Sequence, residues 1–275
     1  MRTIVLFMAL SLAMATSCQK SIVNKDMQGG ALQESKKTRQ AAGKKISDSS
    51  KSKFEILVKV YSEFLDSADQ VNLYWKDGTV MQIDDGIMDK SHEEMLDNSD
   101  IEDMLSQKYV SGELSEDPPL NFEPGRIRYE PFFKKIFGEN ESEVRARLVD
   151  VQWVDGSQIL FSSVNGASDS LKLVIQSLKE LPSEFDKYLV NIGGTFVWRN
   201  IANTNRLSNH SFGTSIDINT KYTDYWQWNK NLNYRNRIPF EIVEIFEKYG
   251  FIWGGKWYHY DTMHFEFRPE LILTN

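Results

Sequence analysis

Two short stretches of this 275-residue chain alternate apolar and polar side chains, and this pattern restricts each stretch to a strand with one buried face. The first, SNHSFGTSIDIN, spans residues 208–219, where the isoleucines point to one face and Asp217 points to the other. The second, YHYDTMHFEFRPE, spans residues 258–270, where apolar residues alternate with His264 and Glu266. If the two strands are neighbours, their polar faces coincide.

These polar faces predict a metal site. His210 precedes the first strand, and Gly213 permits a sharp bend that turns the histidine back over that strand. His210, Asp217 and His264 then form a set of three ligands with a fourth position open, which is typical of catalytic rather than structural zinc. Other divalent metals accept the same ligands, and the alternative is that these polar residues simply face water.

A catalytic zinc needs a base that takes a proton from water. Asp261 lies three residues before His264, where its carboxylate can reach that water without binding the metal. His259 is the competing candidate for the base. The simpler interpretation of His259 is a stacked or exposed residue in an aromatic-rich loop.

Composition and charge narrow the class of protein. The hydrophobic fraction of 41% is ordinary for a globular protein, and the net charge of −7 argues against a nucleic-acid partner. Helical and strand patterns do not alternate regularly, so the sequence predicts an α+β fold rather than a doubly wound sheet.

Residues 1–18 are typical of an export signal. Arg2, an apolar run too short to span a membrane, and small residues precede Cys18, the only cysteine in the chain. The arrangement resembles a bacterial lipoprotein signal, although Ala15 stands where leucine is usual, and we expect Cys18 to be lipidated. The alternative is an ordinary signal peptide. Residues 19–52 are polar and indicate a flexible linker, so we expect an exported envelope protein anchored to a membrane.

The remaining chain divides into two blocks. Residues 54–143 are expected to pack on the rest as an N-terminal extension, and an Asp-Gly pair between two apolar runs predicts a hairpin there. His92, in an acidic segment of this block, is either a ligand or, as we favour, part of a solvated helix face. Residues 144–275 contain a predicted strand pair, RARLVDVQWV and SQILFSSV, a helix capped by Ser168 or Asp169, and a strand, NIGGTFVWR.

Several motifs of the second block resemble a known family. SNHSFGTSID is similar to the SxHxxGxxxD motif of the D-alanyl-D-alanine carboxypeptidase family of zinc peptidases, which includes VanY-type enzymes, and DTMHFEF is similar to the family's second motif. GFIWGGKWYHYDTMHFEF and GTFVWRNIANTNRLSNHSFG match runs seen in one branch of the family. The resemblance covers about residues 144–275.

The resemblance implies a hedgehog-like or DD-peptidase-like α+β fold, in which a small antiparallel sheet carries a zinc site and helices pack around it. It implies hydrolysis of D-amino-acid-containing peptides of the peptidoglycan stem, by a carboxypeptidase or an L-Ala-D-Glu endopeptidase. On the matching motif positions, His210, Asp217 and His264 are the zinc ligands and Asp261 is the base.

The resemblance also suggests residues that contact substrate. Arg199 falls near the family arginine that stabilises the substrate oxygen, although Arg206 is also close. Ser208 falls on the motif serine, which hydrogen-bonds substrate. Ser215 replaces a frequent alanine, and we expect this change to be tolerated.

Two pairs of tryptophans have open interpretations. Trp253 and Trp257 either line a substrate groove or pack the loop before the last strand, and Trp226 and Trp228 form either a lid or a surface loop. The function has alternatives too: a non-catalytic envelope lipoprotein that binds cell-wall peptide with the same fold, or a purely structural lipoprotein. The presence of Asp261 favours the enzyme, because a binding module has little need of a base beside a metal.

Overall fold

The computed structural model describes residues 48–274. The predicted signal peptide, Cys18 and the predicted linker up to residue 47 lie outside the described residues, and helix α1 (Asp48–Val60) begins at the end of that linker range. Within the described part of the chain, no helix has the length and apolar character needed to cross a lipid bilayer.

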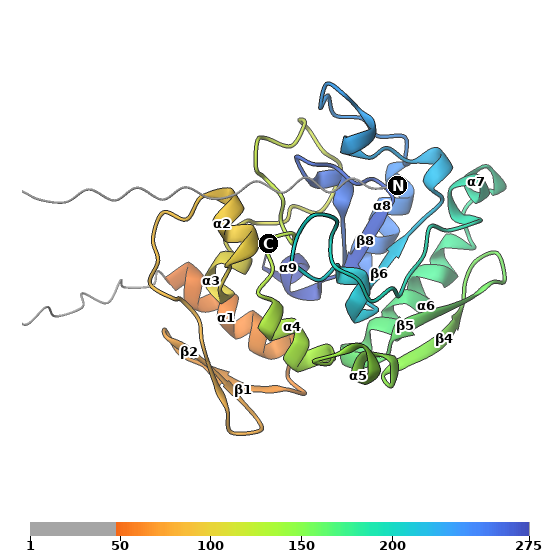
Figure 1. Ribbon diagram of the computed structural model, residues 1–275. Helices are drawn as coiled ribbons and strands as arrows, with labels where there is room; N and C mark the ends of the chain where they lie inside the picture. The colour runs from red at the N-terminus through yellow and green to blue at the C-terminus, as the bar shows by residue number, and fades with distance from the viewer. Residues whose placement is uncertain (1–47, 275) are drawn as a thin grey trace, which may run out of the picture. The chain divides into compact units, whose positions relative to one another are not determined.

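After α1, the chain forms a three-stranded antiparallel sheet whose order is β1-β2-β3 and which contacts α1 (Figure 1). Asp77 and Gly78 form the turn between the second and third strands, where Gly78 adopts a φ of +83°, and the predicted hairpin is confirmed. The elements of this part are β1 (Leu65–Ala68), β2 (Asn72–Trp75), β3 (Val80–Gln82), α2 (His92–Asp97), α3 (Ile101–Met104), α4 (Glu130–Phe137) and α5 (Glu141–Arg145).

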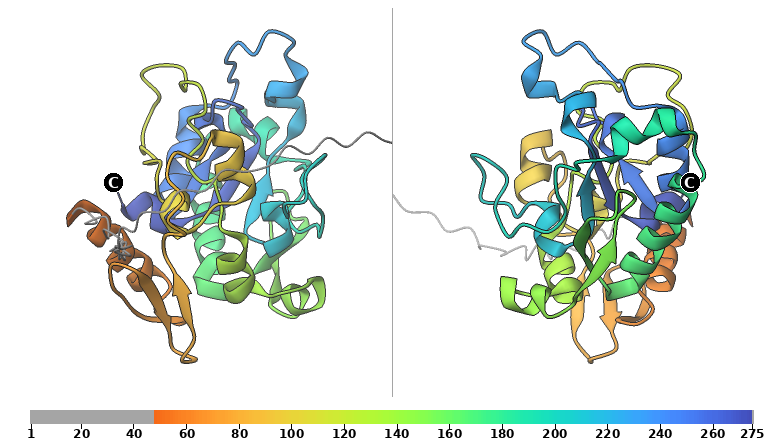
Figure 2. Two further views of the ribbon diagram at one scale, coloured as in Figure 1. Left: turned by 60° about the vertical axis from the view of Figure 1, so that its left-hand side comes forward. Right: turned by 90° about the vertical axis from the view of Figure 1, so that its right-hand side faces the viewer.

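The rest of the described chain carries two further antiparallel sheets. One is the predicted strand pair, β4 with β5, and the other has the order β6-β8-β7. Figure 2 shows β6 and β8 side by side near the centre of the described unit. The elements are β4 (Leu148–Gln152), β5 (Gln158–Ser162), α6 (Ala167–Leu178), α7 (Asp186–Leu189), β6 (Ser215–Asp217), α8 (Phe240–Lys248), β7 (Phe251–Trp253), β8 (His264–Phe267) and α9 (Pro269–Leu273). The architecture is therefore α+β with small antiparallel sheets.

Two local predictions for this part were wrong. Helix α6 begins at Ala167 with Gly166 as its N-cap residue, so neither Ser168 nor Asp169 caps it, and Ser168 is buried. The stretch GTFVWR forms no strand: Gly194 makes one isolated bridge to Asp217, and the following residues run without a ladder. Its apolar residues suit a strand, but the backbone groups of Val197 and Arg199 bond to His210 and Ser208, where the chain enters a 3₁₀ helix and offers no ladder.

The apolar side chains form two clusters that meet at the third sheet. One cluster lies between this sheet, α6 and α8, where the rings of Phe246 and Phe265 stack with centroids 3.9 Å apart. The other cluster contains residues of α1 and α4 together with Phe212, Ile252 and Trp257. The second cluster therefore draws on both of the blocks predicted from the sequence, and these blocks share one core.

Buried polar contacts also join the two blocks. The Tyr61 hydroxyl donates to Glu270 at 2.9 Å, and the Arg268 guanidinium, which is fully buried, donates to the Gly125 carbonyl at 2.9 Å. Burying such groups is unfavourable unless they are hydrogen-bonded, so these pairings fix the position of one block against the other.

Candidate functional site

The register of two strands brings the predicted metal ligands together. β6 pairs with β8 so that Asp217 lies directly opposite His264, which confirms the predicted pairing of the two motif strands. Ile216 and Phe265 occupy the opposite face and are fully buried in the core. The apolar face therefore anchors the sheet, and the two polar side chains meet on the other face.

The third predicted ligand reaches this face from a short 3₁₀ helix, Asn209–Phe212. Gly213 ends the helix with a φ of +66°, a left-handed conformation that glycine adopts without strain, and the chain bends there into β6. His210 Nε2 lies 3.2 Å from Asp217 Oδ2 and 3.2 Å from His264 Nδ1, and His264 Nδ1 lies 2.7 Å from Asp217 Oδ1. His210, Asp217 and His264 offer ligand atoms that all lie within 4.8 Å of one another.

The second nitrogen of each imidazole has its own partner. His210 Nδ1 faces the carbonyl of Thr195 at 2.5 Å, and His264 Nε2 faces Glu266 Oε1 at 3.0 Å. Each acceptor holds the proton of that nitrogen, which leaves His210 Nε2 and His264 Nδ1 facing Asp217. Once these two nitrogens are deprotonated, they can offer lone pairs to a cation placed between the three side chains. Histidine ligands of metals are usually oriented by such outer hydrogen bonds.

The electrostatics of the site favour a positive charge. Burial by itself would raise the pKa of Asp217 and lower that of His264. His210, through its charge and its hydrogen bond, and then His264 reverse the shift of Asp217, whereas Asp217 and Glu266 reverse the shift of His264. The pKa of Asp217 is held well below its usual range, and the pKa of His264 is raised to about 10. Glu266 is also buried, and His264 lowers its pKa to about 2. Two carboxylates thus surround His264, and a divalent cation can replace its proton.

The predicted base lies in the same cavity as the ligands. Asp261 lines a cavity of about 290 Å³ together with His210, Asp217 and His264. Burial, followed by the charge of Asp217, raises the pKa of Asp261 to about 6. Within the described residues, the buried Oδ1 atom of Asp261 has no hydrogen-bond partner. A carboxylate with a pKa near neutrality and a free oxygen is suited to accept a proton.

The predicted substrate-binding polar residues also reach this small cavity. Ser208 is buried and lines it, Arg199 is exposed and lines it, and Arg206 is half-buried with Nε 3.1 Å from Asp97 Oδ1. Ser215 does not line the small cavity or the larger cavity described below; its buried hydroxyl accepts a hydrogen bond from Asn209 at 2.8 Å, which accounts for a serine at this position.

The structure separates the tryptophans that the sequence grouped together. Trp257 and Trp226 line the small cavity, whereas Trp228 is 61% exposed and does not. Trp253 is buried in the core below the sheet, where its indole donates to the Thr262 carbonyl, so it is not brought to the cavity. The sequence pattern does not tell which face of β7 (Phe251–Trp253) packs into the core, and Trp253 lies on the face that does.

A buried carboxylate near the site was missed by the sequence reasoning. Glu123 is 1% exposed; it contacts His259 Nδ1 at 2.5 Å, His92 Nε2 at 3.2 Å and Arg126 Nη1 at 3.3 Å. His259 is therefore paired with Glu123 and does not line the small cavity, and His92 is half-buried rather than solvated. Glu123 lies in a loop without apolar periodicity, so no sequence pattern marked it.

Two further arginines of the N-terminal extension line the small cavity, Arg126 and Arg128. Arg128 donates to the Leu207 carbonyl at 2.6 Å and lies 3.8 Å from Glu266, and burial lowers its pKa to about 10. Arg128 thus supports the carboxylate that orients His264. Neither arginine belongs to a motif, and only their place in the fold identifies them.

A family comparison covers the segment that carries the site. Residues 202–267 match the family described as D-alanyl-D-alanine carboxypeptidase. The matched segment includes His210, Asp217, Asp261 and His264, so the resemblance noted from the motifs is confirmed. No curated protein and no solved structure matches the chain. At a general level, the D-alanyl-D-alanine carboxypeptidase match supports a peptidase that acts on peptidoglycan.

A second group of acidic residues has a simpler explanation. Asp84, Asp85 and Asp100 bring carboxylate oxygens close together, but Lys90 Nζ lies 2.8 Å from Asp85 and 3.4 Å from Asp100. The ammonium group supplies the positive charge that this cluster needs.

Proposed function

We propose that this protein is a zinc-dependent peptidase that hydrolyses D-amino-acid-containing stem peptides of peptidoglycan, as a carboxypeptidase or an L-Ala-D-Glu endopeptidase. The observation that carries the proposal is the convergence of His210, Asp217 and His264 in one cavity with Asp261. The D-alanyl-D-alanine carboxypeptidase match over the same segment supports it. By analogy with that family, we assign the chain a hedgehog-like, DD-peptidase-like fold.

The ligand set fits zinc on its own chemistry. Two imidazoles, each with its outer nitrogen hydrogen-bonded, and one ionised carboxylate are three ligands of the kind that catalytic zinc sites use. A metal held by His210, Asp217 and His264 would act as a Lewis acid toward the scissile carbonyl and the attacking water.

The other side chains of the cavity supply the remaining roles. Asp261 accepts a proton from the attacking water, and its free Oδ1 and raised pKa support this role. Arg199 donates to the scissile carbonyl oxygen as negative charge develops there, since a guanidinium offers several fixed donors. Ser208 and Trp257 contact the peptide from the cavity wall.

We also propose where the protein acts. Cys18 carries the lipid anchor, residues 19–52 form the linker, and the described unit works at the bacterial envelope on peptide substrate without a nucleic-acid partner. The non-catalytic alternative is an envelope lipoprotein that binds cell-wall peptide with the same site. The buried Oδ1 of Asp261, which has no hydrogen-bond partner among the described residues, favours the enzyme, because a binding module gains nothing from such a carboxylate.

Digestion of purified muropeptides tests the proposal. The wild-type protein should release products identified by mass, a chelator that removes the metal should stop the release, and added zinc should restore it. The products also tell which bond is cut. Hydrolysis that continues after metal removal has been confirmed would refute zinc dependence, and intact muropeptides with bound peptide would favour the binding protein.

A further inference from the structure

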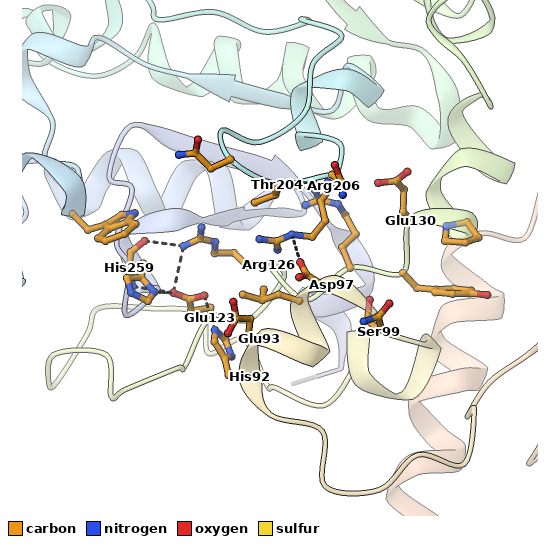
Figure 3. Close-up of a pocket in the computed structure, with 18 residues that line it drawn as sticks. His92, Glu93, Asp97, Ser99, Glu123, Arg126, Glu130, Thr204, Arg206 and His259 are labelled. Carbon is orange, nitrogen blue, oxygen red and sulfur yellow. Dashed lines mark hydrogen bonds and ion pairs between the residues drawn. The ribbon is translucent and has the colours of Figure 1, made fainter. Parts of the chain in front are cut away.

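A second, larger cavity adjoins the small one. It has a volume of about 1120 Å³ and shares Arg126, Arg128, Thr204, Arg206 and Trp226 with the small cavity. Most of its other lining residues belong to α2 and to the loop around residues 123–131, both in the N-terminal extension (Figure 3). A peptide that reaches the metal ligands must extend beyond the 290 Å³ of the small cavity, and the larger cavity is the adjoining space.

Arg126 is held in place on the wall between the two cavities. Its Nη1 atom donates to Glu123 Oε1 at 3.3 Å and to the His259 carbonyl at 3.2 Å, as Figure 3 shows, and its guanidinium lies 5.3 Å from the centre of the Trp257 ring. Both of these hydrogen bonds use the Nη1 atom, and the charge of Arg126 also acts on Asp261 in the small cavity. One side of the Arg126 guanidinium is therefore fixed, and its other nitrogens are available to a ligand.

Arg206 faces the same wall with an incomplete set of partners. Its Nε lies 3.1 Å from Asp97 Oδ1, but this ion pair is not aligned as a hydrogen bond, and the buried Nε has no hydrogen-bond acceptor among the described residues. Burial lowers the pKa of Arg206, the charge of Asp97 opposes this shift in part, and the nearby charge of Arg126 adds to it. Two guanidinium groups that repel each other across a cavity are stabilised by an anion placed between them.

The charge balance of the small cavity points the same way. Four arginines line it, against three carboxylates, in a chain whose net charge is −7. Arg128 is occupied by Leu207 and Glu266, and Arg199 lies on the exposed rim. Arg126 and Arg206 contact Glu123 and Asp97, which line the larger cavity, and both guanidinium groups also reach the wall that the two cavities share.

We infer that Arg126 and Arg206 bind a carboxylate of the substrate, and that the N-terminal extension, residues 54–143, completes the substrate cleft. The ligand class is a peptide with a free carboxylate close to the scissile bond. In a stem peptide this carboxylate belongs either to the D-glutamyl residue or to the C-terminus. The inference rests on the proposed function for its substrate class, but not on catalysis.

Binding measured without turnover tests this inference. The probes are the pentapeptide L-Ala-γ-D-Glu-L-Lys-D-Ala-D-Ala and two analogues, one amidated at the D-glutamyl α-carboxylate and one at the C-terminus. Calorimetry uses the zinc-loaded Asp261→Asn protein, so that peptides are not consumed. One of the amidated peptides should bind about 10-fold to 100-fold more weakly than the acid, because a charge-assisted pair of hydrogen bonds is lost. The amide that binds weakly identifies the carboxylate.

Variants of the two arginines, combined with the amidated peptides, test whether the arginines bind the carboxylate. In Arg126→Gln and Arg206→Gln, the acid should bind as weakly as that amide, so that the difference between acid and amide disappears. Arg126→Lys keeps the charge without the fork and should recover only part of the affinity. Arg235→Gln, an exposed arginine that lines neither cavity, should bind like the parent. Melting temperatures of all variants check that they are folded.

The outcomes separate this inference from the proposed function. Equal binding of all three peptides, no binding of any, or arginine variants that weaken acid and amides alike would overturn the inference, even if the wild-type enzyme hydrolyses muropeptides. Carboxylate-dependent binding through Arg126 and Arg206 would support it, even if the wild-type protein hydrolyses nothing.

Discussion

The isosteric substitution Asp261→Asn should make the metal-free protein more stable while it removes activity. The pKa of Asp261 rises from the usual 3.8 to about 6 in the folded protein, a difference of about 2 pH units, because the carboxyl is buried and because the charge of Asp217 lies nearby. At 1.36 kcal/mol per unit, ionised Asp261 lowers the free energy of unfolding by up to about 3 kcal/mol. Asparagine keeps the volume of the side chain and removes the charge.

The pH dependence of this gain follows from the sign of the shift. Below about pH 4 the carboxyl is protonated in both the folded and the unfolded protein, so Asp261→Asn gains little there. The penalty on the wild-type protein grows between about pH 4 and pH 6 and is complete above it. The gain should therefore appear as the pH rises and reach its maximum near neutrality.

Urea unfolding of the metal-free proteins at pH 7.5 and at pH 4 measures the effect. The matched control is Asp169→Asn, whose side chain is 77% exposed in an ion pair with Lys172 and whose removal should change the stability by less than about 0.5 kcal/mol. If Asp261→Asn is no more stable than the wild type at pH 7.5, the carboxylate is not destabilised by its surroundings, and the argument for a poised base loses its basis.

Three further predictions concern the site, and a fourth concerns the N-terminal signal. Asp261→Ala should retain zinc and lose about 10²–10⁴-fold in turnover, whereas His264→Ala should lose zinc as well; metal content measured beside the rate distinguishes a base from a ligand. The rate of the wild-type enzyme should fall on the acid side with a midpoint at about pH 6 or below, because Asp261 must be ionised and a bound metal lowers its pKa; a midpoint above pH 7 contradicts this role. Arg199→Lys should lower the turnover number about 10²–10³-fold with zinc intact, while Arg206→Lys should mainly raise KM; the opposite pattern assigns the transition-state role to Arg206. Cys18→Ser should move the protein from the membrane fraction to the soluble fraction, and an unchanged distribution would exclude the anchor.

The sequence could predict that His210, Asp217 and His264 converge, because their segments carry a strong local signal. Alternation places Asp217 and His264 on the polar faces, and pairing of the two apolar faces into one core leaves a single register in which these residues meet. Gly213 supplied the bend that returns His210 to the sheet. Local pattern and tertiary packing agree at these positions.

The sequence could not predict the contribution of the N-terminal extension to the site. Arg126 and Glu123 lie in a loop more than 80 positions before His210, and neither helical nor strand periodicity marks them. Their role depends on burial of Glu123 against His92 and His259, which only tertiary packing produces. For the stretch GTFVWR the prediction failed in the other direction. Its local pattern favours a strand, but in the structure it makes one isolated bridge and no ladder.

The buried hydrogen bond between Tyr61 and Glu270 has a consequence for how the chain reaches its native state. The two residues lie 209 positions apart, so the second cluster, which contains Tyr61, cannot form this contact until Glu270 has been synthesised. Contacts of such long sequence separation require a large loop to close before they contribute any stabilisation, which slows folding. A fragment restricted to residues 202–267 would leave Phe212 without the rings of Phe133 and Phe137 in α4, whose centroids lie 5.7 and 6.1 Å from its own. The segment that matches the family is thus part of a larger cooperative unit, and we expect it to unfold together with the extension in a single transition.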